Sequence, residues 1–368
     1  MKIREISFYR EFKCLAGECP STCCRGWMIP LSEEDRLRFM KEGGLLGLRL
    51  CLAASPDEPS VLNKGGLTCP FHKNNGLCEL QLKKGHSFIP ESCRDYPRFF
   101  RNYTFFEERL IDLSCVLGAR LFMDNTDRLY FTEYEGSPYS EPCCTNDDTG
   151  YFRSLLGARQ EILTELRDVS DPDKLSSVLS RTVSYCMDAG RAFLSGDTAF
   201  FEKHSLKEYP QRLSLFPFDL TLFDRLMDTG ITGSLLFYKN PLLNRLCALY
   251  KRLRGKTLRT DKGLKELGSL FFTAHPKAPR LLSAYYSYYL LGYFMQSYED
   301  YSFVRNASAG IVHLNMIFLF MVILNAGQKE LSRDMTAHII SSYNKKAYYN
   351  ESVLKEMYEI MRQSIYSE

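Results

Sequence analysis

The chain has 368 residues, of which 45% are hydrophobic and 25% charged, and its formal net charge at pH 7 is +3. This composition is typical of a globular protein with two or three packed units, and it excludes a largely disordered chain. The small net charge argues against a general polyanion-binding surface, so we expect no nucleic-acid partner.

The N-terminal segment indicates the expected compartment. Residues 1–10 alternate charged with apolar side chains and lack the apolar segment and the small-residue cleavage site of a signal peptide. We therefore expect the protein to be cytoplasmic. In that reducing environment, cysteine patterns bind metal or act in catalysis more often than they form disulfides.

Cysteines dominate the first part of the chain. Eleven of the thirteen fall within residues 1–144, and the first four are separated by four, three and zero residues. Thiolates are soft ligands that suit zinc or an iron–sulfur cluster. Adjacent Cys23 and Cys24 point in different directions, which fits two irons of one cluster or two separate sites. The candidate metal ligands are Cys14, Cys19, Cys23, Cys24, Cys69, Cys78, Cys93 and Cys115.

The remaining cysteines have other interpretations. Cys51, Cys186 and Cys247 are isolated among apolar residues, so we expect them to be ordinary buried cysteines. Cys143 and Cys144 lie in a segment with the composition of a linker, and the sequence favours neither a ligand role nor a packing role for them.

Short elements are predicted in residues 1–135. Ser32 caps a predicted helix that ends at Gly43, and the loop at 51–75 contains prolines and glycines that allow it to wrap a metal site. Aromatic and β-branched residues predict a hairpin and one further strand. These strands are expected at 98–103, 105–113 and 128–134.

Long helical patterns follow residue 150. Asp171 and Pro172 form an N-cap with proline at the first helical position. The apolar runs 281–295 and 311–324 are too short to span a bilayer, so we expect buried core helices and no membrane span. Helices are predicted at 151–166, 172–194, 198–207, 220–228, 235–253, 261–272, 278–298, 303–325, 329–343 and 352–365.

The predicted fold class is therefore mainly α. A cysteine-rich metal-binding domain with short strands is expected at 1–135 and a linker at 136–150. The rest of the chain, 151–368, is expected to form an all-α helical bundle.

Three further side chains are candidates for supporting a metal or cofactor. Arg94 and Arg98 can offset thiolate charge or hold an anionic cofactor group, and Trp27 can shield a cluster from water. His72 and His86 are left outside the predicted site, because a lone loop histidine more often faces solvent.

The tyrosine-rich segment 284–293 has two interpretations. Tyr285, Tyr289 and Tyr293 share one face of a predicted helix. Tyrosines can shape a site for a lysine amine, but on an apolar helix face they more often pack in the core. We expect them to be packing residues, and the sequence identifies no catalytic residue.

Spaced motifs run through residues 12–120. They are Phe12-x-Cys14-x4-Cys19-x3-Cys23-Cys24-x-Gly26-Trp27, Cys69-Pro70-Phe71, Gly76-Leu77-Cys78, Pro90-x2-Cys93-Arg94-x-Tyr96-Pro97-Arg98 and Leu113-Ser114-Cys115. Together they resemble the flagellin lysine-N-methylases and their cysteine-rich, metal-chelating relatives. The family often has Cys-Pro where this chain has Cys115-Val116, a departure that weakens the case for Cys115.

The resemblance implies a protein-lysine N-methyltransferase that acts on flagellin. It also implies S-adenosylmethionine as the methyl donor and dependence on a 4Fe–4S cluster held by the N-terminal cysteines. Such a cluster needs four of the eight candidates, and the sequence leaves open which four, as well as zinc in place of iron. The expected partner is flagellin, with no membrane and no nucleic acid.

Other chemistries fit the sequence less well. A Rossmann-type methyltransferase needs a glycine-rich turn between a strand and a helix, yet Gly43-Gly44 follows a predicted helix and Gly65-Gly66 lies in a loop. A radical-type Cys-x3-Cys-x2-Cys motif is broken because Cys24 follows Cys23 directly. The main rival is a non-catalytic zinc- or iron-binding interaction protein, and a redox carrier is a third reading.

Overall fold

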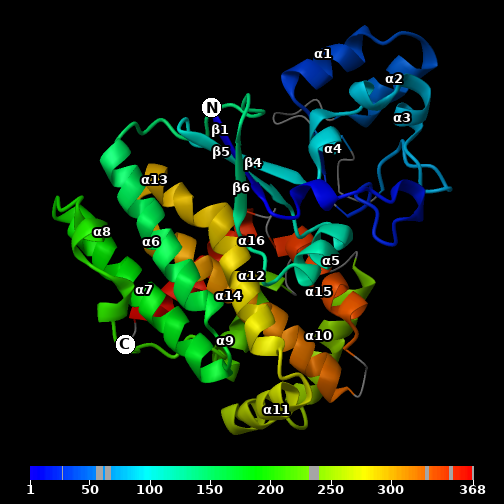
Figure 1. Ribbon diagram of the computed structural model, residues 1–368. Helices are drawn as coiled ribbons and strands as arrows, with labels where there is room; N and C mark the ends of the chain where they lie inside the picture. The colour runs from blue at the N-terminus through cyan, green and yellow to red at the C-terminus, as the bar shows by residue number, and fades with distance from the viewer. Residues whose placement is uncertain are drawn as a thin grey trace.

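The structure is a computed structural model, and it describes residues 1–26, 28–54, 61–62, 68–231, 240–327, 331–347 and 351–366. It is mostly helical with a small sheet, which confirms the predicted mainly α class (Figure 1). In Figure 1 the N-terminal helices α1 to α4 stand together to one side of the sheet, and the helices after residue 149 form the main body.

A four-stranded sheet has the order β4-β5-β1-β6. Strands β4 and β5 pair antiparallel, which confirms the predicted hairpin, and β1 adds parallel to β5 and antiparallel to β6. Strand β1 is not among the strands predicted from the sequence. The strands of the four-stranded sheet are β1 (Lys2–Ile6), β4 (Arg98–Asn102), β5 (Phe106–Ile111) and β6 (Phe131–Glu135). A separate pair consists of β2 (Ile29–Pro30) and β3 (Val61–Leu62).

The N-terminal helices are short. The predicted cap at Ser32 is confirmed, because its hydroxyl accepts a hydrogen bond from the Asp35 amide at 3.1 Å and the Asp35 carboxylate accepts one from the Ser32 amide at 3.2 Å. The helices are α1 (Glu33–Lys41), α2 (Gly44–Ala53), α3 (Glu79–Lys84), α4 (Glu91–Asp95) and α5 (Val116–Asp124), with 3-10 turns η1 (Tyr9–Glu11), η2 (Ala16–Glu18) and η3 (His86–Phe88).

Longer helices build the main body. They are α6 (Thr149–Arg167), α7 (Pro172–Leu194), α8 (Phe200–Lys203), α9 (Leu220–Arg225), α10 (Pro241–Arg254), α11 (Asp261–Ala274), α12 (Ala278–Tyr293), α13 (Ser297–Asp300), α14 (Phe303–Ala326), α15 (Arg333–Ala347) and α16 (Glu351–Tyr366). Short turns join some of them: η4 (Leu206–Glu208), the π-helical η5 (Leu226–Ile231) and η6 (Phe294–Gln296).

Two predicted helices differ from the structure. The helix expected at 198–207 is only α8 followed by η4, because His204 adopts an extended conformation between them. The helix expected at 278–298 ends at Tyr293, where a 3-10 turn begins. Part of the helix expected at 235–253 lies outside the described residues, and α10 begins at Pro241.

Helix α14 is the centre of the main body. It contacts α7, α10, α11, α12, α15 and α16. With 24 residues it is longer than the apolar run at 311–324 and is long and apolar enough to cross a membrane by length and composition. However, 94% of its apolar window is buried inside the protein, as predicted for a core helix.

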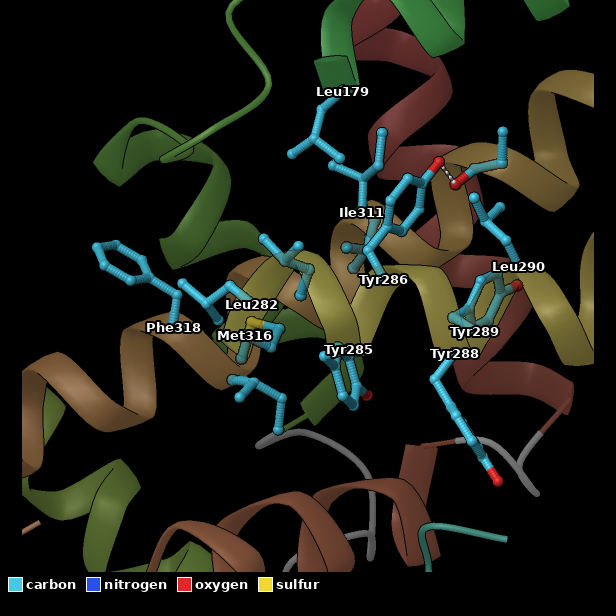
Figure 2. Close-up of a cluster of buried hydrophobic side chains, with 14 of the residues drawn as sticks. Leu179, Leu282, Tyr285, Tyr286, Tyr288, Tyr289, Leu290, Ile311, Met316 and Phe318 are labelled. Atoms are coloured by element: carbon cyan, nitrogen blue, oxygen red, sulfur yellow. Dashed lines mark hydrogen bonds between the residues drawn. The ribbon is translucent and has the colours of Figure 1, made fainter. Parts of the chain in front are cut away.

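The tyrosines of α12 are packing residues, as expected. Tyr285 and Tyr286 are buried, with hydroxyls that donate to Asn344 of α15 at 2.7 Å and to the Ala307 carbonyl of α14 at 3.1 Å, and Figure 2 shows both among leucine, isoleucine, methionine and phenylalanine side chains. Tyr288 points toward the sheet, where its hydroxyl donates to the Ile111 carbonyl at 2.7 Å and accepts from the Ile111 amide at 3.0 Å. These bonds join α12 to the end of β5, so the sheet and the helices share one large core.

A second, small core lies under the N-terminal helices. Among the residues that the structure describes, its nine buried members are Ile29, Leu31, Phe39, Leu50, Leu62, Cys69, Phe71, Leu80 and Ile89. So small a core supplies little stability, which in small units is usually supplemented by disulfides or a metal. The sheet strands within residues 1–135 pack with the large core instead, and the predicted division at 135 and 150 stays a prediction.

Candidate metal centre

Four cysteines from four separate segments gather beside the small core. Cys69 belongs to that core, and the other three pack against it. The Cys69 amide donates to the Cys24 carbonyl at 2.8 Å, next to an antiparallel bridge between Arg25 and Thr68. Another antiparallel bridge pairs His72 with Cys78, the residue that precedes α3. We call this set the cysteine quartet: Cys24, Cys69, Cys78 and Cys93.

The thiols of the quartet affect one another's ionisation. Burial raises the pKa of Cys69 to about 12, and negative charge on Cys24 and Cys78 adds to the shift. Burial also raises the pKa of Cys93, and charge on the other three members of the quartet adds to it. The four thiols thus lie near enough to influence one another's charge, in agreement with their shared contact with the small core.

Adjacent Cys23 and Cys24 behave differently. The Cys23 thiol donates a hydrogen bond to Cys24, which raises the pKa of Cys23 and lowers the pKa of Cys24 to about 6. The charges of Lys345 and Arg25 lower the pKa of Cys24 further. Cys24 is therefore the thiol of this pair that most readily becomes a thiolate, the form that binds metal.

Three of the other candidates, Cys14, Cys19 and Cys115, form a second group. Burial raises the pKa of Cys115, the residue before α5, to about 11, and negative charge on Cys19 and Cys14 adds to it. Cys14 itself is exposed, and its sulfur accepts a hydrogen bond from the Ala16 amide at 3.3 Å. The eight predicted ligands thus separate into the quartet, the outer cysteines (Cys14, Cys19 and Cys115) and Cys23, which Cys24 and Cys93 of the quartet influence.

Two glycines allow the cysteine loops to approach. Gly76 has a φ of +80°, and a Cβ atom there would lie 2.6 Å from the Gly17 carbonyl oxygen. A Cβ atom on Gly17 would lie 2.7 Å from the Asn75 carbonyl oxygen. Only glycine fits two backbones this close, so this contact fixes the loop before Cys78 against the loop that carries Cys19.

Asp35 and Arg94 position α4, which carries Cys93. The Asp35 carboxylate is 1% exposed and accepts from the Glu91 amide at 3.0 Å, so the residue that caps α1 also holds the start of α4. The Arg94 guanidinium donates to the carbonyls of Ser87 and Ile89 at 3.2 and 2.9 Å. Arg94 therefore orders the chain before Cys93, a role that needs no cofactor.

Of the other two predicted supporting residues, Arg98 and Trp27, the structure describes only Arg98. The Arg98 guanidinium lies over the rings of Tyr9 and Phe12, with its carbon 5.8 and 5.5 Å from their centroids. Trp27 lies outside the described residues. Their predicted roles at a cofactor stay predictions.

Two lysines from α15, which the sequence pattern did not indicate, hold the loop that carries Cys23 and Cys24. We call this loop, residues 22–26, the cysteine loop. The Lys345 ammonium is largely buried and donates to the Thr22 carbonyl at 3.0 Å, and Lys346 donates to the Gly26 carbonyl. Burial lowers the pKa of Lys345, while nearby Cys23 and Cys24 act in the opposite direction. No local spacing could reveal them, because they lie more than three hundred residues from the loop they contact.

A polar cavity of about 900 Å³ opens beside the cysteine loop. Basic side chains line it, and none of its described lining residues is acidic. They include Arg25, His72, His338, Lys345 and Lys346, together with Cys19. Of these, His72 has a buried Nε2 atom with no hydrogen-bond partner in the described structure. The arginine and lysine charges of this lining offset the negative charge that several thiolates would carry.

The cysteines outside the eight are distributed as follows. Cys186 and Cys247 are buried, as predicted, but Cys51 is exposed on α2, so its prediction as a buried residue is wrong. The apolar run around Cys51 forms a helix that turns this position to solvent. Cys143 is exposed and Cys144 half-buried.

The donor chemistry of the quartet fits zinc or an iron–sulfur cluster, since both accept four thiolates. In the parts of the chain that the structure describes, no three His, Cys, Asp or Glu side chains lie close enough to hold a metal ion. No disulfide joins any of the thirteen cysteines, all of which are described.

Comparison with known proteins gives distant and partial matches. Distant relatives are named lysine-N-methylase. The protein of that name from Salmonella typhimurium is 22% identical over 143 residues, which cover 36% of this chain and 35% of the relative. The flagellar biosynthetic protein FliU of Salmonella muenchen is 23% identical over 143 residues, covering 36% of this chain and 82% of that protein.

These matches support the resemblance found in the sequence, although the chain spans only about a third of the length of the lysine-N-methylases it matches. No family model matches the chain, and no solved structure does. The names of the matched proteins thus point to lysine methylation and to the flagellum.

Proposed function

We propose that this protein is a cytoplasmic lysine N-methyltransferase that modifies flagellin, with S-adenosylmethionine as methyl donor. The observation that carries the proposal is the similarity to proteins named lysine-N-methylase and FliU. The gathering of cysteines from distant segments supports it, because the motifs that carry the resemblance are those that the fold brings together.

The proposed ligands of a 4Fe–4S cluster are the cysteine quartet. Its four sulfurs come from four segments around the small core, and Cys24 has the lowered pKa that favours a thiolate. A cluster there would supply four strong bonds between segments whose own core has nine residues. The lysines of α15 would then balance part of its negative charge.

The proposed reaction is a direct displacement. The lone pair of a neutral lysine amine forms a bond to the methyl carbon, the carbon–sulfur bond breaks, and its electron pair stays on sulfur as S-adenosylhomocysteine forms. The methylated amine then gives its proton to solvent or to a base. The enzyme's task is to hold both reactants in line and to keep the amine unprotonated, which a dry site favours.

Mass spectrometry of flagellin tests the proposed function directly. Lysines of flagellin from cells with the gene should carry methyl groups that are absent when the gene is deleted and that return on complementation. Equal methylation in all three strains would overturn the proposal. Purified flagellin mixed with the anaerobically isolated protein and labelled S-adenosylmethionine should also gain label on lysine.

A second candidate is a non-catalytic protein whose zinc or iron fastens the small N-terminal unit to the helices. The packing of the quartet against a core too small to supply much stability favours this second function. Iron and sulfide analysis of anaerobically purified protein separates the two metals. One zinc per chain with no iron, and no transfer to flagellin, would favour this second function.

A further inference from the structure

A second cavity lies between the sheet and helices α6 and α12. It shares no described lining residue with the cavity beside Cys19. Its volume is about 520 Å³, within the range of small-molecule sites. Residues of β1, β6, α6 and α12 line it, and none of the cysteines is among its described lining residues. Figure 1 shows α6 and α12 crossing the main body below the sheet.

Arg4 and Arg159, which line this cavity, form ion pairs with the buried carboxylate of Glu108. The Arg159 guanidinium donates to both carboxylate oxygens of Glu108, at 2.9 and 2.6 Å, and to the Leu291 carbonyl at 3.2 Å. Arg4 donates to the same carboxylate at 2.9 Å. Arg159 and Glu108 are almost wholly shielded from solvent, so these two arginines of the lining already have a charged partner.

Two further arginines stand at one end of the cavity without such partners. Arg167 is in the last turn of α6 and Arg280 is in the first turn of α12, and both are exposed. The Ser283 hydroxyl donates to the Leu166 carbonyl at 2.6 Å, which brings these two helix ends together. Within the described residues, no hydrogen bond or ion pair occupies either guanidinium.

The rest of the lining is mixed in character. Leu163, Leu291 and Phe131 give an apolar wall, while Asp127 and half-exposed Tyr130 lie toward the open side. A ligand that matches all of these groups has a carboxylate or phosphate, a flat apolar body and a positive centre. Arginine pairs take carboxylates with two parallel hydrogen bonds, and aromatic rings and acids attract cations.

We propose that this cavity binds S-adenosylmethionine, an inference that rests on the proposed function. Its carboxylate would pair with Arg167 and Arg280, its purine would lie on the apolar wall, and its positive groups would face Asp127 and Tyr130. The cavity beside the cysteines suits this ligand poorly, because the methyl donor has two positive groups and one negative group, and that cavity's described lining has no acid.

This assignment separates the methyl donor from the cysteines. The open side of the cavity, where Tyr130 is 50% exposed, is where a lysine of a protein substrate can enter. The cysteine quartet then fastens the N-terminal unit and does not bind the donor. S-adenosylmethionine should accordingly leave the electron paramagnetic resonance spectrum of a reduced cluster unchanged.

Equilibrium binding to the metal-loaded full chain tests the site. Arg167→Gln and Arg280→Gln should each weaken S-adenosylmethionine and S-adenosylhomocysteine at least about tenfold, as expected for a lost charge-assisted hydrogen bond. Adenosine, which lacks the carboxylate, should bind both variants as it binds the wild type. Arg153→Gln is the matched control, since Arg153 is an exposed arginine of α6 that does not line the cavity.

A steric variant gives independent evidence. Ala284 lines the cavity and is 6% exposed, so Ala284→Phe should fill it and abolish binding of all three ligands while the circular dichroism spectrum stays native. Unchanged binding in the arginine and phenylalanine variants would overturn the site and leave the proposed function standing. A wild-type protein that binds no S-adenosylmethionine would overturn the inference, and the flagellin comparison decides the function separately.

Discussion

Lys345 of α15 donates a hydrogen bond of 3.0 Å to the carbonyl of Thr22, a residue 323 positions earlier in the chain. With the neighbouring bond from Lys346 to the Gly26 carbonyl, it attaches the loop that carries Cys23 and Cys24 to the helical body. The cysteine loop is thus held by the last part of the main body as well as by its own small core.

Replacement of Lys345 should loosen this attachment. Lys345→Met leaves the Thr22 carbonyl without its charged donor, so we expect unfolding to become easier by about 1–3 kcal/mol and metal content to fall. Denaturant unfolding and metal analysis measure both effects. Lys355→Met, at an exposed position of α16, should change neither. Equal stability of the two variants would contradict the role given to Lys345.

Metal content should depend on the quartet. Cys24→Ser and Cys93→Ser each remove one of four proposed ligands, so the purified protein should lose most of its iron or zinc. Cys51→Ser, at an exposed cysteine outside the eight, should keep the wild-type content. Cys14→Ser should resemble this control. Loss of metal in Cys14→Ser, with full retention in Cys24→Ser, would contradict the quartet and indicate that the outer cysteines bind the metal.

A glycine pair tests the close approach of the cysteine loops. Gly76 and Gly85 both have positive φ, +80° and +86°, but only at Gly76 would a Cβ atom meet another backbone. Both alanine variants therefore suffer backbone strain of about 1 kcal/mol, and Gly76→Ala adds a clash. Thermal unfolding should show the larger loss for Gly76→Ala, together with lower metal content. Equal losses would show that the contact with Gly17 is unimportant.

Stability should fall in acid partly because of His313. Burial lowers the pKa of His313 to about 3, and its Nδ1 atom lies 2.9 Å from the Tyr343 hydroxyl. An unfolded histidine has a pKa of about 6.5, so the unfolded state binds more protons between these values. The free energy of unfolding therefore decreases as pH falls below about 6.5, by up to about 1.4 kcal/mol per pH unit from this residue.

His313→Gln should remove that part of the acid sensitivity. Denaturant unfolding at several pH values between 4.5 and 7.5, values chosen to span about two units below the ordinary histidine pKa, gives the slope for each protein. The exposed His86→Gln variant should keep the wild-type slope, because solvent reaches His86 in both states. A His313→Gln slope that equals the wild-type slope would rule out His313 as the source.

The ion pair of Arg159 and Glu108 gives a further stability test. Arg159→Met leaves a wholly buried carboxylate with only Arg4 as a charged partner, so we expect a loss of about 3–5 kcal/mol. Arg159→Met combined with Glu108→Leu removes both charges and should recover much of this loss. Chemical denaturation measures the two variants, and a double variant that is weaker than the single one would contradict the account.

Much of the local structure was predictable because its causes are local. Ser32 and Asp171 cap helices through side chains that reach amides three residues on, and the sequence contains both ends of each bond. The hairpin of β4 and β5 likewise joins neighbouring segments. Strand β1 escaped prediction because its place beside β5 depends on residues a hundred positions away.

The candidate site was predictable only as a set of residue types. The spacing of the cysteines indicated metal ligands, yet nothing in it separated the quartet from the outer cysteines, because that division follows from how four loops fold around the small core. Arg94 was expected to support a cofactor, which stays a prediction, and the structure adds that it orders the turn before α4. Its partners are the backbone carbonyls of Ser87 and Ile89, and their positions depend on the conformation of the turn.

The sequence alone thus determined that the chain is mainly helical, where most helices lie, and that thiol chemistry concentrates near its N-terminus. These follow from periodicity, caps and composition, which act between near neighbours. Only the tertiary structure decided that Lys345 lies beside Cys24 and that Arg167 and Arg280 share one cavity. Such neighbours are set by the packing of the whole core, in which contacts join residues with no relation in sequence.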